Sequence, residues 1–226
     1  MDKRDFLDEF IGHAKKDMQG ELGEKFISTK LDRGQFLFFE GDATSALYLI
    51  ESGVIEANVV RGDGKVYIFH FVFPGEVLGE GIAYGQNHHL FSAVTRKDAV
   101  AWRIAKNDLL RALEADHEFE RYIMRVVGEK LDNSYVKTRC IAGERVERRI
   151  TCILLKTMDE SSEISEYPGK LDTPLTNRDI SGLIGATEET VSRVMSRLKK
   201  KDIIGTRNKQ LVVLDRDALI QYFESV

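Results

Sequence analysis

The sequence predicts an α+β protein in which a β-domain, a long helix and a C-terminal helix-turn-helix follow one another along the chain. Residues 30–105 alternate short apolar strands with glycine turns. Residues 117–141 show one helical periodicity without proline, and residues 175–215 combine two short helices with a hairpin. The expected domains are 1–115, 116–142 and 143–226.

Composition limits the function classes. The net charge is −4, so affinity for nucleic acid must come from a local patch. No apolar run approaches the roughly 20 residues of a membrane span, and the charged N-terminus lacks the apolar core of a signal peptide. Cys140 and Cys152 have no CxxC spacing, which argues against a cysteine-ligated cluster. We therefore expect a cytoplasmic protein that does not bind membranes.

The β-domain is predicted from strands separated by glycine turns. GQFLFFEGD is expected to form one short strand, and the apolar run that follows is expected to break at Ser52-Gly53 and at Gly62-Asp63-Gly64. FSAVTRKDAVAWRI is expected to give two more strands. Many short strands with regular turns indicate a sandwich or barrel-like domain.

The next segment is a predicted helix about 37 Å long. Its apolar residues recur at steps of three and four. They are Phe119, Ile123, Val126, Val127, Leu131, Tyr135 and Ile141. This stripe could lie wholly on the β-domain of its own chain, or divide between that domain and a partner helix in a dimer. We favour the dimer helix.

The C-terminal part contains a pattern typical of DNA-binding domains. Thr176 with Asp179 resembles a capping box, and Gly182 and Gly185 are expected to end that short helix. TEETVSRVMSRLKKKDII then predicts a second helix, which Thr187 would cap. Its expected buried stripe is Val191, Val194, Met195 and Leu198. DIIGTRNKQLVVLD predicts a hairpin turning at residues 207–209, and the preceding SSEISEYPGKLDTP predicts a loop or edge strand.

The polar face of the second helix could read bases. Arginine pairs with guanine and a carboxylate accepts from the cytosine amino group, so Arg193 and Glu189 could form such a pair of readers. The lysines at the helix end and Arg207 would contact phosphates. Acids at a helix start and lysines at its end are each more often ordinary surface features. Together with the preceding helix, turn and hairpin, they favour DNA binding.

LTNRDISGLIGATEETVSRVMSRLKKKDII resembles the signature of the CRP/FNR superfamily of bacterial transcription regulators, and the similarity extends over nearly the whole chain. The resemblance implies a jelly-roll-like β-roll sensor, a dimerisation helix and a winged helix-turn-helix. Glu189 followed by Ser192-Arg193 is more similar to the FNR branch than to the cyclic-AMP receptor branch, which has glycine in place of Ser192. That implies a palindrome with half-sites near TTGAT.

The resemblance also leaves one base position open. Glu188 departs from both branches, so the outer base preference is not fixed, while Arg178 is expected near a phosphate. The full set of expected DNA-binding residues is Arg178, Thr187, Glu188, Glu189, Ser192, Arg193, Arg197 and Lys200.

FPGEVLGEGIAYGQNHHLFSAVTRKDAVAWRI resembles the segment that carries the phosphate cassette of cyclic-nucleotide-binding domains. Gly79-Glu80 stand where family binders hold the ribose hydroxyl, and Phe91-Ser92 stand where they have arginine-serine. A buried phosphate needs a cationic partner, and losing one charge-assisted bond costs about 1.5–3 kcal/mol. We therefore expect a small-molecule effector other than cyclic AMP.

The resemblance suggests further sensing groups. Ser134 and Tyr135 match helix positions that touch the effector in family members. Some relatives sense gases through haem, and His88-His89 could supply an axial ligand, although an exposed polar loop is the commoner role of such a pair. No iron–sulfur cluster is expected, because the fumarate-nitrate regulators carry an N-terminal cysteine cluster and this N-terminus has no cysteine. A thiol switch at Cys140 would have no partner nearby in sequence.

These observations favour an effector-gated homodimer that binds double-stranded DNA and regulates transcription, with RNA polymerase as a partner if it activates. The alternative is a sensor module acting through a protein partner, which predicts no functional winged helix. An enzyme is not expected, because the sequence has no glycine-rich phosphate loop and no GxSxG, HExxH or paired-carboxylate motif.

Overall fold

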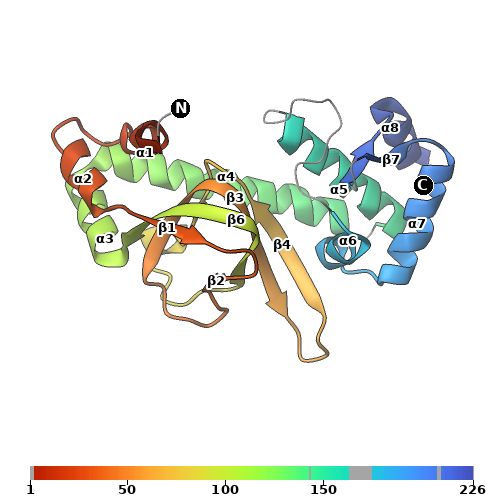
Figure 1. Ribbon diagram of the computed structural model, residues 1–226, viewed down its shortest axis with the longest axis horizontal. Helices are drawn as coiled ribbons and strands as arrows, with labels where there is room; N and C mark the ends of the chain where they lie inside the picture. Colours follow the sequence, from red (N-terminus) through yellow and green to blue (C-terminus); the bar gives the residue numbers. More distant parts are fainter. Residues whose placement is uncertain (1–2, 143, 163–174, 208–209, 226) are drawn as a thin grey trace. The chain divides into compact units, whose positions relative to one another are not determined.

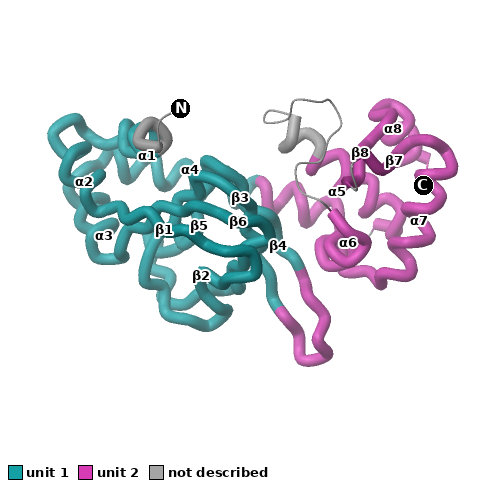
Figure 2. Tube along the Cα trace, in the orientation of Figure 1, with its two compact units in different colours: residues 1–59, 68–132 teal, residues 60–67, 133–226 magenta. Residues whose placement is uncertain are grey.

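The computed structural model groups the chain into two compact units (Figure 2). The first comprises residues 1–59 and 68–132, and the second residues 60–67 and 133–226. The residues described are 3–142, 144–162, 175–207 and 210–225. Most of the segment predicted as a loop or edge strand before residue 175 lies outside them. Among the described residues, no helix has both the length and the apolar character needed to cross a membrane.

The first unit is built on a six-stranded sheet (Figure 1). Its strands are β1 (Ile27–Leu31), β2 (Phe36–Phe38), β3 (Ala46–Val60), β4 (Val66–Val72), β5 (Val77–Leu78) and β6 (Ser92–Ala105). The main order is β1-β6-β3-β4, with β2 paired to β6 and β5 paired to β3. β6 pairs antiparallel with β1, β2 and β3, so this one strand carries most of the sheet's connections.

Two strand predictions are wrong. β3 runs through Ser52-Gly53 for 15 residues, because its register against β6 shifts there without ending the strand. Gly53 has φ 88°, and a Cβ at this position would lie 2.5 Å from the carbonyl oxygen of Asp98. Glycine here allows a bulge, not a turn. β6 is likewise one strand of 14 residues where two were expected. The turn at 62–64 is confirmed, with a hydrogen bond of 2.8 Å from Gly64 N to Arg61 O.

Helices cover one part of this sheet. They are α1 (Lys3–Ile11), α2 (Gln19–Lys25), the 3-10 helix η1 (Glu80–Tyr84), α3 (Lys106–Ala115) and the first half of α4 (His117–Ile141). The 25-residue helix predicted at 117–141 is confirmed. Asp116 begins it by accepting a hydrogen bond of 2.9 Å from Glu118 N. Phe119 and Ile123 are fully buried in one core with Phe10, so this half of α4 belongs to the β-domain.

The second unit is a winged helix-turn-helix (Figure 1). Its elements after α4 are α5 (Val146–Ser162), α6 (Asn177–Ile184), α7 (Glu188–Lys200), β7 (Ile204–Arg207), β8 (Gln210–Val213) and α8 (Arg216–Ser225). The capping box is confirmed, since Thr176 N donates to Asp179 Oδ2 at 2.9 Å and Asp179 N donates to Thr176 Oγ1 at 3.2 Å. α6 ends at Ile184 and Gly185, with φ 65°, caps it as predicted; Gly182 is buried inside the helix, contrary to prediction.

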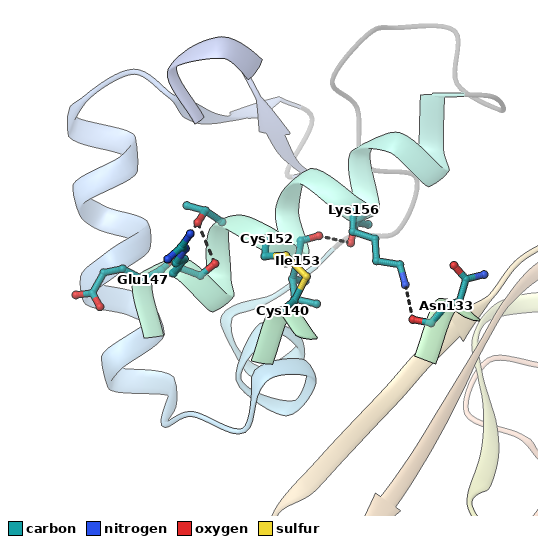
Figure 3. Close-up of a disulfide and its surroundings, with 9 residues drawn as sticks. Asn133, Cys140, Glu147, Cys152, Ile153 and Lys156 are labelled. Carbon is teal, nitrogen blue, oxygen red and sulfur yellow. Dashed lines mark hydrogen bonds between the residues drawn. A yellow bond between two sulfur atoms is a disulfide. The ribbon is translucent and has the colours of Figure 1, made fainter. Parts of the chain in front are cut away.

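The two cysteines form a disulfide (Figure 3). Cys140 lies in the last turn of α4 and Cys152 lies on α5, 12 residues later. The expectation that a thiol at Cys140 lacks a nearby partner is therefore wrong. The disulfide holds Cys152 of α5 beside the last turn of α4.

Candidate nucleic-acid interface and sensor cassette

Helix α7 is fixed at its start by the turn that precedes it. Gly185 adopts the left-handed conformation, and Ala186 N donates to Ser181 O at 3.1 Å. Thr187 caps α7, as predicted, because its Oγ1 accepts from Thr190 N at 3.3 Å. The predicted stripe of Val191, Val194, Met195 and Leu198 is buried. The opposite face of α7 is therefore left to solvent.

The residues expected to contact DNA lie on the surface. All eight are exposed: Arg178, Thr187, Glu188, Glu189, Ser192, Arg193, Arg197 and Lys200. A concavity of about 360 Å³ lies on α7, lined by Ser192, Arg193, Ser196, Arg197 and Lys200. Ser196 was not among the predicted DNA-binding residues, although it lies four residues after Ser192 and therefore on the same face of the helix. The lining offers hydroxyl and cationic donors, the groups that bases and phosphates accept from.

Two of these residues also hold the domain together. Thr187 Oγ1 is engaged as the helix cap. Arg197 Nη2 forms an ion pair of 3.2 Å with Glu147 Oε1 of α5, a partner that sequence reasoning missed because it lies 50 residues away. Arg193 Nη2 donates to Thr190 Oγ1 at 3.3 Å, a weak contact between exposed groups. Arg193 can therefore reorient toward a base at low cost, whereas Arg197 is tied to α5.

The hairpin predicted after α7 is confirmed. β7 and β8 pair antiparallel from Ile204↔Val213 to Arg207↔Gln210. Arg207 is exposed at the end of β7. The rest of the predicted turn, residues 208–209, lies outside the described residues.

The sensor cassette begins at Gly79, which has φ 85°. A Cβ at Gly79 would lie 2.4 Å from Ala46 O, so only glycine fits between this turn and β3. The next residue, Glu80, forms an ion pair of 2.9 Å between its Oε1 and Lys130 Nζ of α4. Lys130 Nζ also donates to Val77 O. Glu80 Oε2 is buried and accepts no hydrogen bond from the described residues.

Phe91 packs into a cluster of rings. Its centroid lies 5.9 Å from Phe38, 6.0 Å from Phe69 and 5.9 Å from His70. Its neighbour Ser92 is buried, and Ser92 Oγ accepts from Glu40 N at 2.9 Å. The position that holds arginine in family binders is thus occupied by an aromatic contact.

A cation on the same strand is already paired. Arg96 of β6 forms an ion pair of 3.0 Å with Glu56 of β3, whose side chain is 5% exposed. A buried carboxylate that loses its counter-charge is strongly destabilising. Arg96 therefore cannot leave Glu56 cheaply to bind a phosphate in place of the arginine missing at position 91.

The two histidines of the cassette differ. His88 is exposed, whereas the ring of His89 stacks on Phe38 with centroids 3.5 Å apart. Burial lowers the pKa of His89, although Asp42 and Glu80 act in the opposite direction. One ring face of His89 is thus covered by packing. Within the described part of the chain, no group of three or more histidine, cysteine, aspartate or glutamate side chains could hold a metal ion.

Helix α4 presents different faces along its length. Phe119 and Ile123 are fully buried, whereas Met124 is 46%, Leu131 is 50% and Tyr135 is 64% exposed. The exposed residues recur at steps of seven and four, which gives one apolar stripe. Ser134 and Tyr135, the expected effector contacts of this helix, are both exposed and belong to the second unit.

Two family models match the chain. The cyclic nucleotide-binding domain matches residues 28–116, and the Crp-like helix-turn-helix domain matches residues 148–222. The chain belongs to the CRP/FNR family of transcription regulators. The predicted fold class is confirmed, and so is the expectation that the protein is a DNA-binding regulator and not an enzyme. The alternative of a sensor acting only through a protein partner is not supported.

Named relatives agree with this assignment. The chain is 24% identical over 192 residues to the fumarate and nitrate reduction regulatory protein of Vibrio cholerae, covering 84% of this chain and 76% of that protein. It is 25% identical over 192 residues to an anaerobic regulatory protein of Pasteurella multocida, covering 84% and 70%. The structure of FixK2 from Bradyrhizobium japonicum has a TM-score of 0.76 and 21% identity, covering 87% of this chain and 96% of that one. The structural likeness concerns the fold alone.

Proposed function

We propose that this CRP/FNR regulator binds, as a homodimer, a DNA palindrome with TTGAT-like half-sites. The observation that carries the proposal is the outer face of α7, where Glu189, Ser192 and Arg193 are all exposed. Arginine can bond the guanine of TTGAT in two places, and glutamate can accept from a cytosine amino group on the opposite strand. Arg178 and Lys200 would contact phosphates beside these bases.

The half-site is tested by fluorescence anisotropy. A duplex with two TTGAT half-sites is compared with a scrambled duplex at the same salt concentration. We expect the palindrome to bind at least about a thousandfold more tightly, the lower end for specific DNA-binding proteins. Equal affinity for the two duplexes would contradict the half-site.

The exposed stripe on α4 supports the homodimer. Two recognition helices must lie about 34 Å apart to enter successive major grooves, which one chain cannot achieve. The apolar residues Met124, Leu131 and Tyr135 would pack against the same helix of a partner. Leu131→Glu should give a monomer in sedimentation velocity and lose palindrome binding. Glu129→Lys changes an exposed charge away from the stripe and should remain a dimer.

The proposed effector is a small molecule other than cyclic AMP. Phe91 supports this, because a ring replaces the cation that a cyclic phosphate needs. Glu80 supports a small-molecule effector of any kind, since Lys130 already pairs with its Oε1, while its buried Oε2 suits a hydrogen-bond donor of a ligand. Calorimetry with cyclic AMP should show no binding in the micromolar range, and binding in that range would contradict the proposal.

The effector itself can be identified by native mass spectrometry of protein purified gently from its host. A dimer with extra mass would give the ligand, and a haem mass would support an axial-ligand role for His88 or His89. A bare dimer would indicate a weakly bound metabolite or a redox signal. We place the protein in the cytoplasm, with the DNA it binds, and expect contact with RNA polymerase where the bound protein activates transcription.

A further inference from the structure

The disulfide lies where the long helix meets the DNA-binding domain (Figure 3). α4 ends at Ile141 and α5 begins at Val146, so Cys140 and Cys152 flank this junction. Their Cα atoms are 6.1 Å apart, within the range that disulfides occupy without backbone movement. Both residues are only half-buried, so small reagents can reach them. They are the only two cysteines of the chain.

Helix α5 is firmly held to the elements that contact DNA. Arg149 Nη1 donates to Ile184 O, the last residue of α6, at 2.8 Å. Glu147 forms its ion pair of 3.2 Å with Arg197 of α7. Ile150 and Leu154 are fully buried in this unit. A change in how α5 is attached to α4 is therefore passed on to the recognition helix.

A hydrogen bond also links α4 and α5. Lys156 Nζ donates to Asn133 O at 3.4 Å, a long hydrogen bond between exposed groups (Figure 3). Beyond such contacts, the short connection after Ile141 joins the two helices. The covalent bond between Cys140 and Cys152 restricts rotation of α5 about the end of α4.

We infer that Cys140 and Cys152 are a thiol–disulfide couple that controls DNA affinity, with the disulfide form as the tighter binder. The inference rests on the proposed DNA binding. A DNA-binding regulator works in a compartment where thiols are kept reduced, and disulfides found there are usually transient and redox-sensing. The disulfide form holds α5, and with it α7, in one orientation on α4. The dithiol form must lose that freedom when it binds, which weakens binding.

The chemistry balances with a low-molecular-weight disulfide such as oxidised glutathione. One protein thiolate attacks the glutathione disulfide, forming a mixed disulfide and releasing one glutathione thiolate. The second protein thiolate then attacks the mixed disulfide, forming the Cys140–Cys152 bond and releasing the second glutathione. The two protein thiols lose two electrons and two protons, which the two glutathione molecules carry away. Excess reduced glutathione runs the same steps backwards.

Basic residues lie close to both cysteines in the sequence. Lys156 lies one helical turn after Cys152 on α5, and Arg139 precedes Cys140 in the chain. Cations near a thiol favour the thiolate, which is the form that attacks a disulfide. Neither cysteine has to leave a closed core for the reaction, since both are half-buried.

The test measures DNA affinity in both redox states. Full-length protein is equilibrated with oxidised or reduced glutathione, its thiol content is checked by alkylation and mass spectrometry, and binding to the TTGAT palindrome is followed by anisotropy. We expect the oxidised protein to bind at least about fivefold more tightly, the lower end of typical coupling between two sites. The double variant C140S/C152S should bind like the reduced protein under both conditions.

Other outcomes overturn the inference. Equal affinity of the two wild-type states, tighter binding by the reduced state, or the same redox response in C140S/C152S would each do so while leaving DNA binding intact. Failure of every form to bind the palindrome would instead reject the half-site. In that case, hydrogen exchange of the oxidised and reduced proteins tests the thiol–disulfide couple. Exchange is expected to be slower around Cys140 and Cys152 in the oxidised protein. Equal exchange in the two states would reject the couple.

Discussion

Helix α7 and the sensor cassette lie in the two segments that match family models, but their side chains are used differently. On α7, buried apolar residues hold the helix, and Glu189, Ser192 and Arg193 face solvent. In the cassette, Glu80 is paired with Lys130 and Phe91 is packed among rings. On α7 the candidate base-reading residues Ser192 and Arg193 are distinct from the buried stripe that holds the helix, whereas in the cassette the candidate effector residues Glu80 and Phe91 are themselves engaged in structural contacts.

This difference affects what each region can tolerate. A substitution of Glu189, Ser192 or Arg193 on the outer face of α7 should have little effect on folding, because these side chains are exposed. A substitution in the cassette changes packing or leaves a charge unpaired, so ligand specificity there cannot change without a compensating change nearby. Membership of the family therefore does not identify the ligand of the cassette.

The largest expected effect is in the cassette. Lys130→Met should lower the free energy of unfolding by about 2 kcal/mol, measured by urea denaturation, because Glu80 is left without its counter-charge. The estimate lies below that for a fully buried pair because the side chains of Lys130 and Glu80 are 24% and 17% exposed. The double variant that adds Glu80→Gln should recover most of the loss. An unchanged unfolding midpoint in Lys130→Met would show that the pair is not structural.

On α7 the expected effect is on binding alone and not on folding. Arg193→Ala should lose about 1–3 kcal/mol on the palindrome and relax one base position, while its unfolding midpoint stays unchanged. The measurement is anisotropy on the palindrome and on its single-base variants.

Lys200→Ala is the matched control for Arg193→Ala. It should weaken binding to palindromic and random DNA alike, and reduce the slope of log affinity against log salt by about 1. If Arg193→Ala lost equal affinity for palindromic and random DNA, Arg193 would contact a phosphate and would not read a base.

The smallest expected effect concerns His89 and pH. Burial lowers the pKa of His89 below the ordinary value of 6.5, so the unfolded chain binds this proton more readily than the folded one. The neutral His89 side chain therefore makes its full contribution to the free energy of unfolding above pH 6.5. This contribution is lost as the pH falls below that value. His89→Phe keeps a ring stacked on Phe38. When the pH is lowered from 7.5 to 5.5, the free energy of unfolding of this variant should fall less than that of the wild type. The exposed control His88→Gln should follow wild type.

Local patterns in the sequence predicted much of this structure. The periodicity of α4 and α7 and the capping box at Thr176 depend on residues three and four apart, so their signals are visible in one stretch of chain. The contacts of the cassette are different, because Lys130 reaches Glu80 from 50 positions away. The disulfide and the Glu147–Arg197 pair likewise depend on how helices fold back. The strand break predicted at Ser52-Gly53 was wrong because glycine occurs in β-bulges as well as in turns.

The backbone at Gly53 and Gly79 has a consequence for the history of the family. Both glycines have positive φ, and any side chain at either position would collide with a neighbouring strand. Natural selection for a different ligand can replace Phe91 or Glu80. It cannot replace these glycines without disrupting the β-domain. In an alignment of relatives that sense unrelated signals, the two glycines should therefore stay constant where the cassette varies. They would serve as better markers of common descent than the candidate effector-binding residues.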